Sequence, residues 1–189
     1  MKNRTILRAA LLVFGGFATG SVTAYAQSWY VFSPYYSLPA WSQKLPAAGR
    51  FQILADWDSE AVLDKETGLV WQRSPGTMQP NKNNQLNALA ICEQNRNGGR
   101  FGWRLPFIHE LSSLLDPTVI GSGPFLPSGH PFTIAGAAGD SVYWSATSAP
   151  GDPNSAMIGV FFGSASVGLA PKTNLYYIWC VRGGSSARP

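Results

Sequence analysis

Three shortages in the sequence narrow what the protein can do. Only 13% of the 189 residues are charged and 45% are apolar, a composition that fits a folded globular domain and excludes a disordered or fibrous chain. The two histidines and two cysteines form no cluster at the short spacings of a zinc site. Neither a G-x-S-x-G nucleophile motif nor a phosphate-binding glycine loop ending in Lys-Ser or Lys-Thr is present. These shortages favour a protein that is not an enzyme and needs no cofactor.

Long apolar runs are also missing. The longest candidate, residues 9–19, falls short of the roughly 20 residues that span a bilayer. It follows three cations in the first eight residues and precedes Ala24-Tyr25-Ala26, the small-residue pattern that signal peptidase recognises. We therefore expect residues 1–26 to be a cleaved signal peptide and the mature chain to have no membrane span. Because no cysteine adjoins the cleavage point, we expect a periplasmic or secreted protein rather than a lipoprotein.

The formal charge of +4 overstates how basic the mature protein is. Loss of the three N-terminal cations reduces the net charge to +1. Bulk charge therefore argues against a nucleic-acid partner.

Cys92 and Cys180 are the only cysteines, and an exported chain is expected to pair them. The bridge would close a loop of about 89 residues, for which the chain-entropy treatment gives roughly 4.5 kcal/mol. A redox or nucleophilic role would require a neighbouring cysteine or histidine, and neither cysteine has one in the sequence. We predict a structural disulfide.

The mature chain divides into an arm, a domain and a tail. Residues 27–49 contain three prolines and six aromatic residues without a helical or strand period, which indicates an extended arm that packs on the domain or on a partner. Residues 50–184 form the domain, and residues 185–189 a disordered tail. The patterns predict helices and strands in this domain: strands at 51–55, 61–64, 69–72, 142–147, 156–162, 165–170 and 175–182, helices at 84–95 and 106–115, and an irregular loop at 118–140.

Two predictions concern which side chains face the core. The first helix should bury a stripe that contains Leu86, Leu89 and Cys92. On the last strand, Tyr176, Ile178 and Cys180 share one face, which the disulfide fixes as inward, so Tyr177, Trp179 and Val181 should face outward. A tight turn is expected at residues 162–164.

The order of four motifs resembles the Lcl C-terminal domain family, named after the terminal domain of a bacterial collagen-like adhesin. The motifs are DKETGLVWQR in the hairpin, GWRLPFIHEL at the second helix, YWSAT in a strand and YYIWCVRGG at the end. The resemblance covers residues 50–184. It implies an α+β, C-type-lectin-like fold, in which a twisted antiparallel sheet and two short helices are held by one disulfide.

The chain departs from the family pattern at three points. Phe107 stands where the family often has Thr, Trp179 stands where Arg is usual, and no Gly-x-y collagen repeat precedes the domain. The second departure puts in doubt any binding that depends on the family arginine. The third removes the stalk that would impose trimers, so the oligomeric state is left open.

The titratable residues give little support for catalysis. His109 lies beside the apolar stripe of the second helix and His130 lies in the irregular loop. The acids Asp56, Asp58 and Glu60, with Asp64 and Glu66, superficially resemble a calcium loop, but the central glycine and distant glutamate are missing. We expect no bound metal, while calcium at this hairpin stays open.

The remaining candidates suit binding of an anionic polymer. Arg96, Arg100, Lys172 and Trp179 are the ligand-binding residues we predict, because guanidinium groups bind sulfate or carboxylate and indole rings stack on sugars. For Trp103 and Arg104 a structural role is favoured over ligand binding. We expect an exported, non-catalytic adhesion or binding module that recognises anionic polysaccharide without calcium. The alternative is a cell-envelope assembly protein that docks on a partner protein through its aromatic arm.

Overall fold

The computed structural model describes residues 45–75, 82–116, 118–121, 123–135, 141–161 and 164–184. All of them belong to one compact unit. The predictions for the signal peptide, for residues 27–44 of the arm, for positions 162–163 of the turn and for the tail at 185–189 lie outside the described residues. No helix in the described part is long and apolar enough to cross a membrane.

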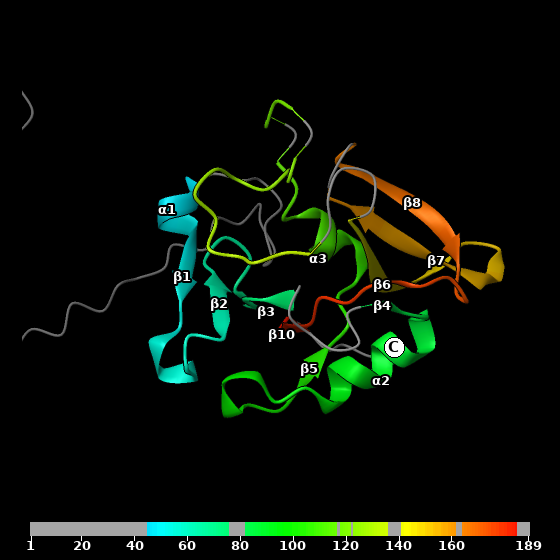
Figure 1. The fold of residues 1–189 in the computed structure, drawn as a ribbon, viewed down its shortest axis with the longest axis horizontal. Coiled ribbons are helices and arrows are strands. Elements are labelled where there is room, and N and C mark those ends of the chain that lie inside the picture. The colour runs from blue at the N-terminus through cyan, green and yellow to red at the C-terminus, as the bar shows by residue number, and fades with distance from the viewer. Residues whose placement is uncertain are drawn as a thin grey trace, which may run out of the picture. The chain divides into compact units, whose positions relative to one another are not determined.

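The first sheet has five strands in the order β1-β2-β3-β10-β5, and every pairing in it is antiparallel (Figure 1). A hairpin forms one half of this sheet, because a turn at residues 65–68 returns the chain and Gly68 there adopts a positive φ of 71°. The strands are Phe51–Ile53 (β1), Ala61–Asp64 (β2), Leu69–Gln72 (β3), Trp103–Arg104 (β5) and Val181–Arg182 (β10).

The second sheet also has five strands, in the order β4-β9-β6-β7-β8. Its three long strands are antiparallel, and β9 joins β6 by a parallel pairing of Tyr177 with Tyr143. The strands are Lys82–Asn83 (β4), Val142–Ala149 (β6), Asp152–Val160 (β7), Ser166–Pro171 (β8) and Tyr176–Tyr177 (β9).

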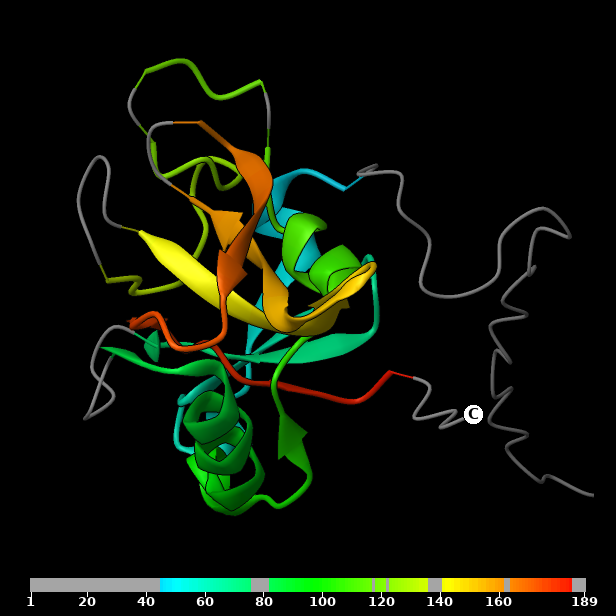
Figure 2. The same ribbon diagram turned by 90° about the vertical axis from the view of Figure 1, so that its right-hand side faces the viewer.

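The segment predicted as one strand over 175–182 is two short strands in different sheets. Residues 178–180 between β9 and β10 belong to neither sheet. In Figure 2 this segment, coloured orange to red, runs between α2 and the three long strands. The prediction of a continuous strand is wrong because the chain leaves one sheet and enters the other, and it therefore joins the two halves of the domain.

Three short α-helices accompany the sheets: Ala47–Arg50 (α1), Gln85–Gln94 (α2) and Ile108–Ser112 (α3). The Asn84 side chain caps α2 by accepting a hydrogen bond from Asn87 N at 2.9 Å. The predicted inward stripe of α2 is wrong at Leu86, which is 74% exposed. Cys92 is buried as predicted, and the other buried residues of the helix are Gln85 and Ala88.

The predicted disulfide is confirmed. Cys92 on α2 bonds Cys180 on the segment between β9 and β10, and both residues are fully buried. The disulfide therefore attaches α2 to the segment that joins the two sheets. The α+β fold with antiparallel strands and short helices is likewise confirmed, while the finer assignment to the C-type-lectin-like fold stays a prediction.

Aromatic rings fill the centre of the domain, and Trp179 lies among them. Its ring centroid is 5.0 Å from that of Phe132, 5.4 Å from Phe161 and 5.5 Å from Trp71 and Tyr143. The prediction that Trp179 faces outward is wrong, because this side chain is 0% exposed. Residues 178–181 are buried whichever way they point, so alternation does not separate an inner from an outer face.

A buried ion pair ties α1 to the hairpin. Arg50 Nε and Nη2 donate to the Asp64 carboxylate at 2.8 and 2.7 Å, and Arg50 Nη2 also donates to the carbonyl of Ser113 at 3.0 Å. Both charged residues are at most 1% exposed. Residues 45–50, of which 45–49 were assigned to the arm by sequence, therefore pack against the domain.

Candidate ligand-binding site

A loop after α2 carries two of the predicted arginines and is fixed against the helical turn Ala55–Trp57 (η1). Gly98 lies in the short turn Asn97–Gly99 (η3), with a positive φ of 61°. A Cβ at Gly98 would lie 2.6 Å from Trp57 Cβ, so only glycine permits this approach. Gly98 N also donates to Glu60 Oε2 at 2.7 Å. The loop is therefore held at a defined distance from Trp57.

Three guanidinium groups lie over two aromatic rings at this loop. Arg96 Cζ is 4.2 Å from the ring centroid of Phe101. Arg100 Cζ and Arg182 Cζ are each 5.3 Å from Trp57. These distances are those of cation–π contacts. We call this surface the arginine–aromatic patch; it consists of Trp57, Arg96, Arg100, Phe101 and Arg182.

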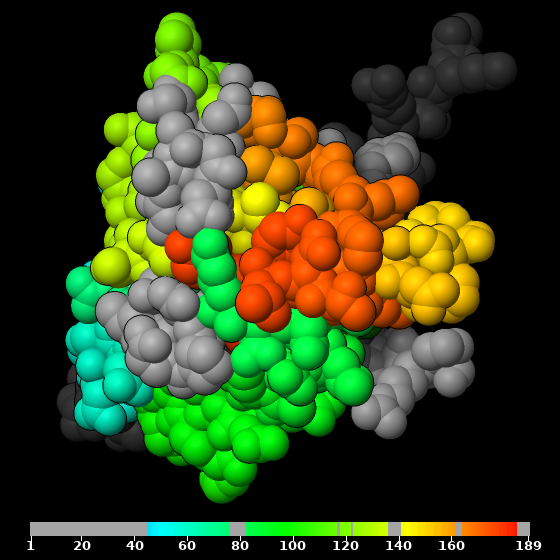
Figure 3. Space-filling model, turned by 45° about the vertical axis from the view of Figure 1, so that its right-hand side comes forward, coloured from blue at the N-terminus to red at the C-terminus, as the bar shows by residue number. Residues whose placement is uncertain are grey.

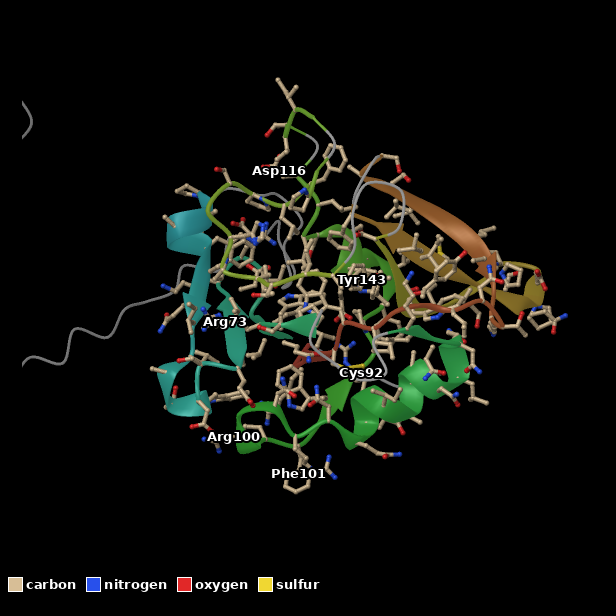
Figure 4. All side chains as sticks on the ribbon, in the orientation of Figure 1. Arg73, Cys92, Arg100, Phe101, Asp116 and Tyr143 are labelled. Atoms are coloured by element: carbon tan, nitrogen blue, oxygen red, sulfur yellow. A yellow bond between two sulfur atoms is a disulfide. The ribbon has the colours of Figure 1, made fainter. Side chains whose placement is uncertain are left out.

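The patch is accessible and incompletely hydrogen-bonded. Phe101 is 67% exposed, and Figure 4 shows it pointing away from the body of the domain next to Arg100. Arg182 Nε donates to the Phe101 carbonyl at 2.7 Å and Arg96 Nη1 to the Asn95 carbonyl at 3.0 Å. Within the described residues none of the three arginines forms an ion pair. Their remaining N–H groups are available to a ligand.

Trp103 and Arg104, which lie beside the patch in sequence, are structural. The Trp103 side chain is 2% exposed and its Nε1 donates to the Asn97 carbonyl at 3.3 Å. Arg104 donates two hydrogen bonds to the Glu110 carboxylate, at 2.7 and 2.5 Å. Glu110 also accepts from Phe107 N at 2.8 Å, so its carboxylate caps the first turn of α3.

The structure does not bring the four predicted ligand residues together. Arg96 and Arg100 belong to the patch after the C-terminal end of α2. Lys172 lines a groove at the N-terminal end of the same helix, and a ten-residue helix is about 15 Å long. Trp179 is removed from the candidate site because it lies in the core.

The acids at the hairpin have separate partners. Asp64 pairs with Arg50, Glu60 accepts from Gly98 N, and Glu66 Oε2 accepts from Leu45 N at 2.9 Å. Across the described ranges, no three residues of the types His, Cys, Asp and Glu are grouped to hold a metal ion. The calcium possibility therefore gains no support from this geometry.

Neither histidine lies in the patch. His109 stacks on Phe107 at 5.6 Å between ring centroids. His130 Nδ1 accepts a hydrogen bond from Phe132 N at 3.2 Å, and partial burial lowers the pKa of His130 below 6.5. Burial also raises the pKa of Tyr143, whose hydroxyl donates to the Ala135 carbonyl. His130 and Tyr143 therefore hold backbone groups of the irregular loop, whereas His109 lies on α3.

A match to a protein-family model identifies the family of this chain. The model of the Lcl C-terminal domain matches residues 60–182. The chain belongs to this family. A search of the curated proteins finds no match. The matched range of this Lcl C-terminal domain contains both cysteines and four of the five patch residues; Trp57 lies three residues before it begins.

Three patch residues are missing from the sequence-based site: Trp57, Phe101 and Arg182. For Phe101 the sequence does contain an indication. This residue stands between glycines at 99 and 102, in a segment with little regular structure against which an aromatic side chain could be buried. Arg182 is one of the cations that the sequence offers with Lys172 near the end of the chain, but nothing in the sequence places it beside Trp57. The two residues are 125 positions apart and meet only through the sheet order.

Proposed function

We propose that this domain is an exported, non-catalytic binding module that holds anionic polysaccharide at the arginine–aromatic patch without calcium. The observation that carries the proposal is the cation–π placement of three guanidinium groups over two rings at an accessible rim of the domain. Membership of a family named after an adhesin's terminal domain is consistent with an adhesin-like role.

The geometry suits anionic groups on a polymer. The three guanidinium groups form no ion pair within the described residues, and their N–H donors match the paired oxygens of sulfate or carboxylate. Arg100 and Arg182 share one ring, so their Cζ atoms are no more than about 11 Å apart. The exposed Phe101 ring offers an apolar face for a sugar. The patch can therefore bind an anionic group and a sugar ring of the polymer at the same time.

The same residues do not suit catalysis or tight single-site binding. Arginine stays protonated at neutral pH, and tryptophan and phenylalanine are neither nucleophiles nor general bases. Asp56 and Asp58 adjoin Trp57 in the chain and are exposed, which reduces the local positive potential. We expect weak binding per site, strengthened by clustering on a surface and weakened by salt.

Retention on immobilised sulfated and neutral polysaccharide, measured across a salt series, tests the proposal. The double variant Arg96→Ala/Arg100→Ala should lower affinity for the sulfated polymer by about tenfold, since two charge-assisted contacts are lost. Lys65→Ala is the matched control, because it removes an exposed cation outside the patch. A chelator should have no effect.

Three outcomes would contradict the proposal: no retention, retention unchanged in the double variant, or retention lost with the chelator. Deleting residues 27–44 should leave retention intact. If that deletion alone abolishes retention, binding belongs to the arm, and the assembly alternative replaces the proposed function.

A further inference from the structure

A groove at the N-terminal end of α2 is separate from the arginine–aromatic patch. It has a volume of about 560 Å³, within the range of roughly 300–1,000 Å³ that small-molecule sites occupy. Leu86, Leu89 and Ala146 contribute its apolar lining, and Ser148 and Lys172 contribute polar groups. In Figure 3 the turn that contains Lys172, coloured red-orange, lies against the green surface of α2.

Hydrogen bonds fix the three elements that border the groove. Gln85 N donates to the Lys172 carbonyl at 3.0 Å, and Gln85 Nε2 donates to the Ser145 carbonyl at 3.0 Å. Gln85 is 4% exposed, so this link between α2, the turn after β8 and strand β6 is protected from water. Lys172 N donates to the Asn154 carbonyl at 2.8 Å and ties the same turn to β7. The groove is therefore preformed rather than a gap between mobile segments.

The high exposure of Leu86 indicates that the groove is a binding surface and not a defect in the packing of the domain. Leu86 stands on a regular helix and is 74% exposed, although Gln85 before it and Ala88 two residues after it are buried. Leu89 and Ala146 beside it are only partly buried. The apolar lining is thus in contact with water, and covering it would be favourable in proportion to the area removed from water.

Lys172 provides one cation at the edge of this apolar surface. Its Nζ donates to Ser148 Oγ at 3.1 Å, and it has no ion-pair partner among the residues that the structure describes. Hydrogen bonds from Ser155 and from the backbone N–H of Asn154 are the main causes that lower the pKa of the exposed Asp152, and Lys172 makes only a smaller contribution. Two of the three ammonium hydrogens of Lys172 are left for a ligand.

We propose that this groove binds a small molecule with an aliphatic body and one carboxylate, with the carboxylate on Lys172 and the body on Leu86, Leu89 and Ala146. A polysaccharide fits the groove less well, because its hydroxyl groups would lose water against aliphatic side chains that offer no hydrogen bond. A single cation matches a single carboxylate. The site is independent of the patch and of the function proposed for it.

The experiment measures binding of a homologous series, butanoate to octanoate, to the chain from residue 27 onward by two-dimensional NMR. Affinity should rise about fourfold for each added methylene until the groove is filled, which follows from the transfer free energy of a buried methylene. Shifts should be largest at Leu86, Leu89 and Ala146. 1-Octanol has the same body without charge and should bind about fivefold more weakly than octanoate, the upper range for a partly exposed ion pair.

Single variants separate the contribution of the lysine charge to binding from that of the apolar lining. Lys172→Met should weaken octanoate binding by about fivefold and leave 1-octanol binding unchanged, while Leu86→Ser should weaken both. Lys65→Met is the control for loss of an exposed lysine elsewhere. The Lys172→Met variant should keep wild-type retention on sulfated polysaccharide, so this proposal and the proposed function can fail separately.

The proposal is overturned by any of three results. These are absence of saturable shifts at millimolar octanoate, shifts located away from the groove, and equal binding of octanoate by wild type and Lys172→Met when both have the same thermal midpoint.

Discussion

Replacing Trp179 by Ala tests whether this residue belongs to the core or to a binding surface. The side chain is 0% exposed and touches four other aromatic rings at centroid distances of 5.0 to 5.5 Å. Truncating a buried tryptophan to alanine costs about 3–5 kcal/mol, since the neighbours collapse only partly into the cavity. The indole Nε1 also donates to the Gln72 carbonyl at 2.8 Å, and leaving that acceptor without a partner costs about 1–3 kcal/mol.

We therefore expect Trp179→Ala to lower the free energy of unfolding by about 5 kcal/mol, a large part of the 5–15 kcal/mol typical of a domain. Trp179→Phe keeps a ring and loses the hydrogen bond, so it should cost about 1–3 kcal/mol. Leu175→Ala is the control; Leu175 is 62% exposed, and the change should stay within about 0.5 kcal/mol. Urea unfolding of the oxidised protein, followed by far-ultraviolet circular dichroism, provides the measurement.

One result would refute this reasoning. If Trp179→Ala unfolds within about 1 kcal/mol of the wild type and loses polysaccharide retention, Trp179 acts at the surface and the packing described for it is incorrect.

Three further perturbations follow from the described contacts. Replacing Cys92 and Cys180 by alanine should cost about 2–5 kcal/mol in thermal or urea unfolding, and two reactive thiols in the unreduced, denatured wild type would contradict the disulfide. Asp64→Asn should cost about 3–5 kcal/mol because Arg50 stays buried without its counter-charge; a double-mutant cycle with Arg50→Met should show a smaller combined loss than the two single changes added. Because burial lowers the folded-state pKa of His130, the unfolded state binds the proton more readily, so stability should be fully present above pH 6.5 and fall as the pH drops through the folded pKa; His130→Asn should flatten that part of the curve, and an unchanged slope would contradict the burial.

The local elements of this fold are predictable from sequence because short-range chemistry determines them. The turn at residues 65–68 needs one positive φ and has Gly68 at that place. The first helix needs a capping side chain and has Asn84. The disulfide follows from pairing the only two cysteines of a chain that the sequence predicts to be exported. The family motifs identify the family, which is confirmed by the matched range of 60–182.

The errors arise where distant segments decide burial. The prediction for residues 176–181 assumes that one face of a strand is buried and the other is exposed to solvent. In the structure both faces are covered by parts of the chain that are far away in sequence. Leu86 is exposed because Gln85 takes the inward position and satisfies its amide on β6. The patch has the same origin, since Trp57 and Arg182 meet only after β10 has joined the hairpin in the first sheet. Side-chain type predicts neither outcome without the three-dimensional neighbours.

The segment 176–182 also has a consequence for biosynthesis. Strand β5 joins its sheet only through β10, and β4 joins the other sheet only through β9. Both linking strands are translated after every other strand of the domain, so neither sheet can be completed while the nascent chain is still being elongated through this segment. Completion of both sheets, and closure of the disulfide between Cys92 and Cys180, therefore has to wait until these final strands have been synthesised.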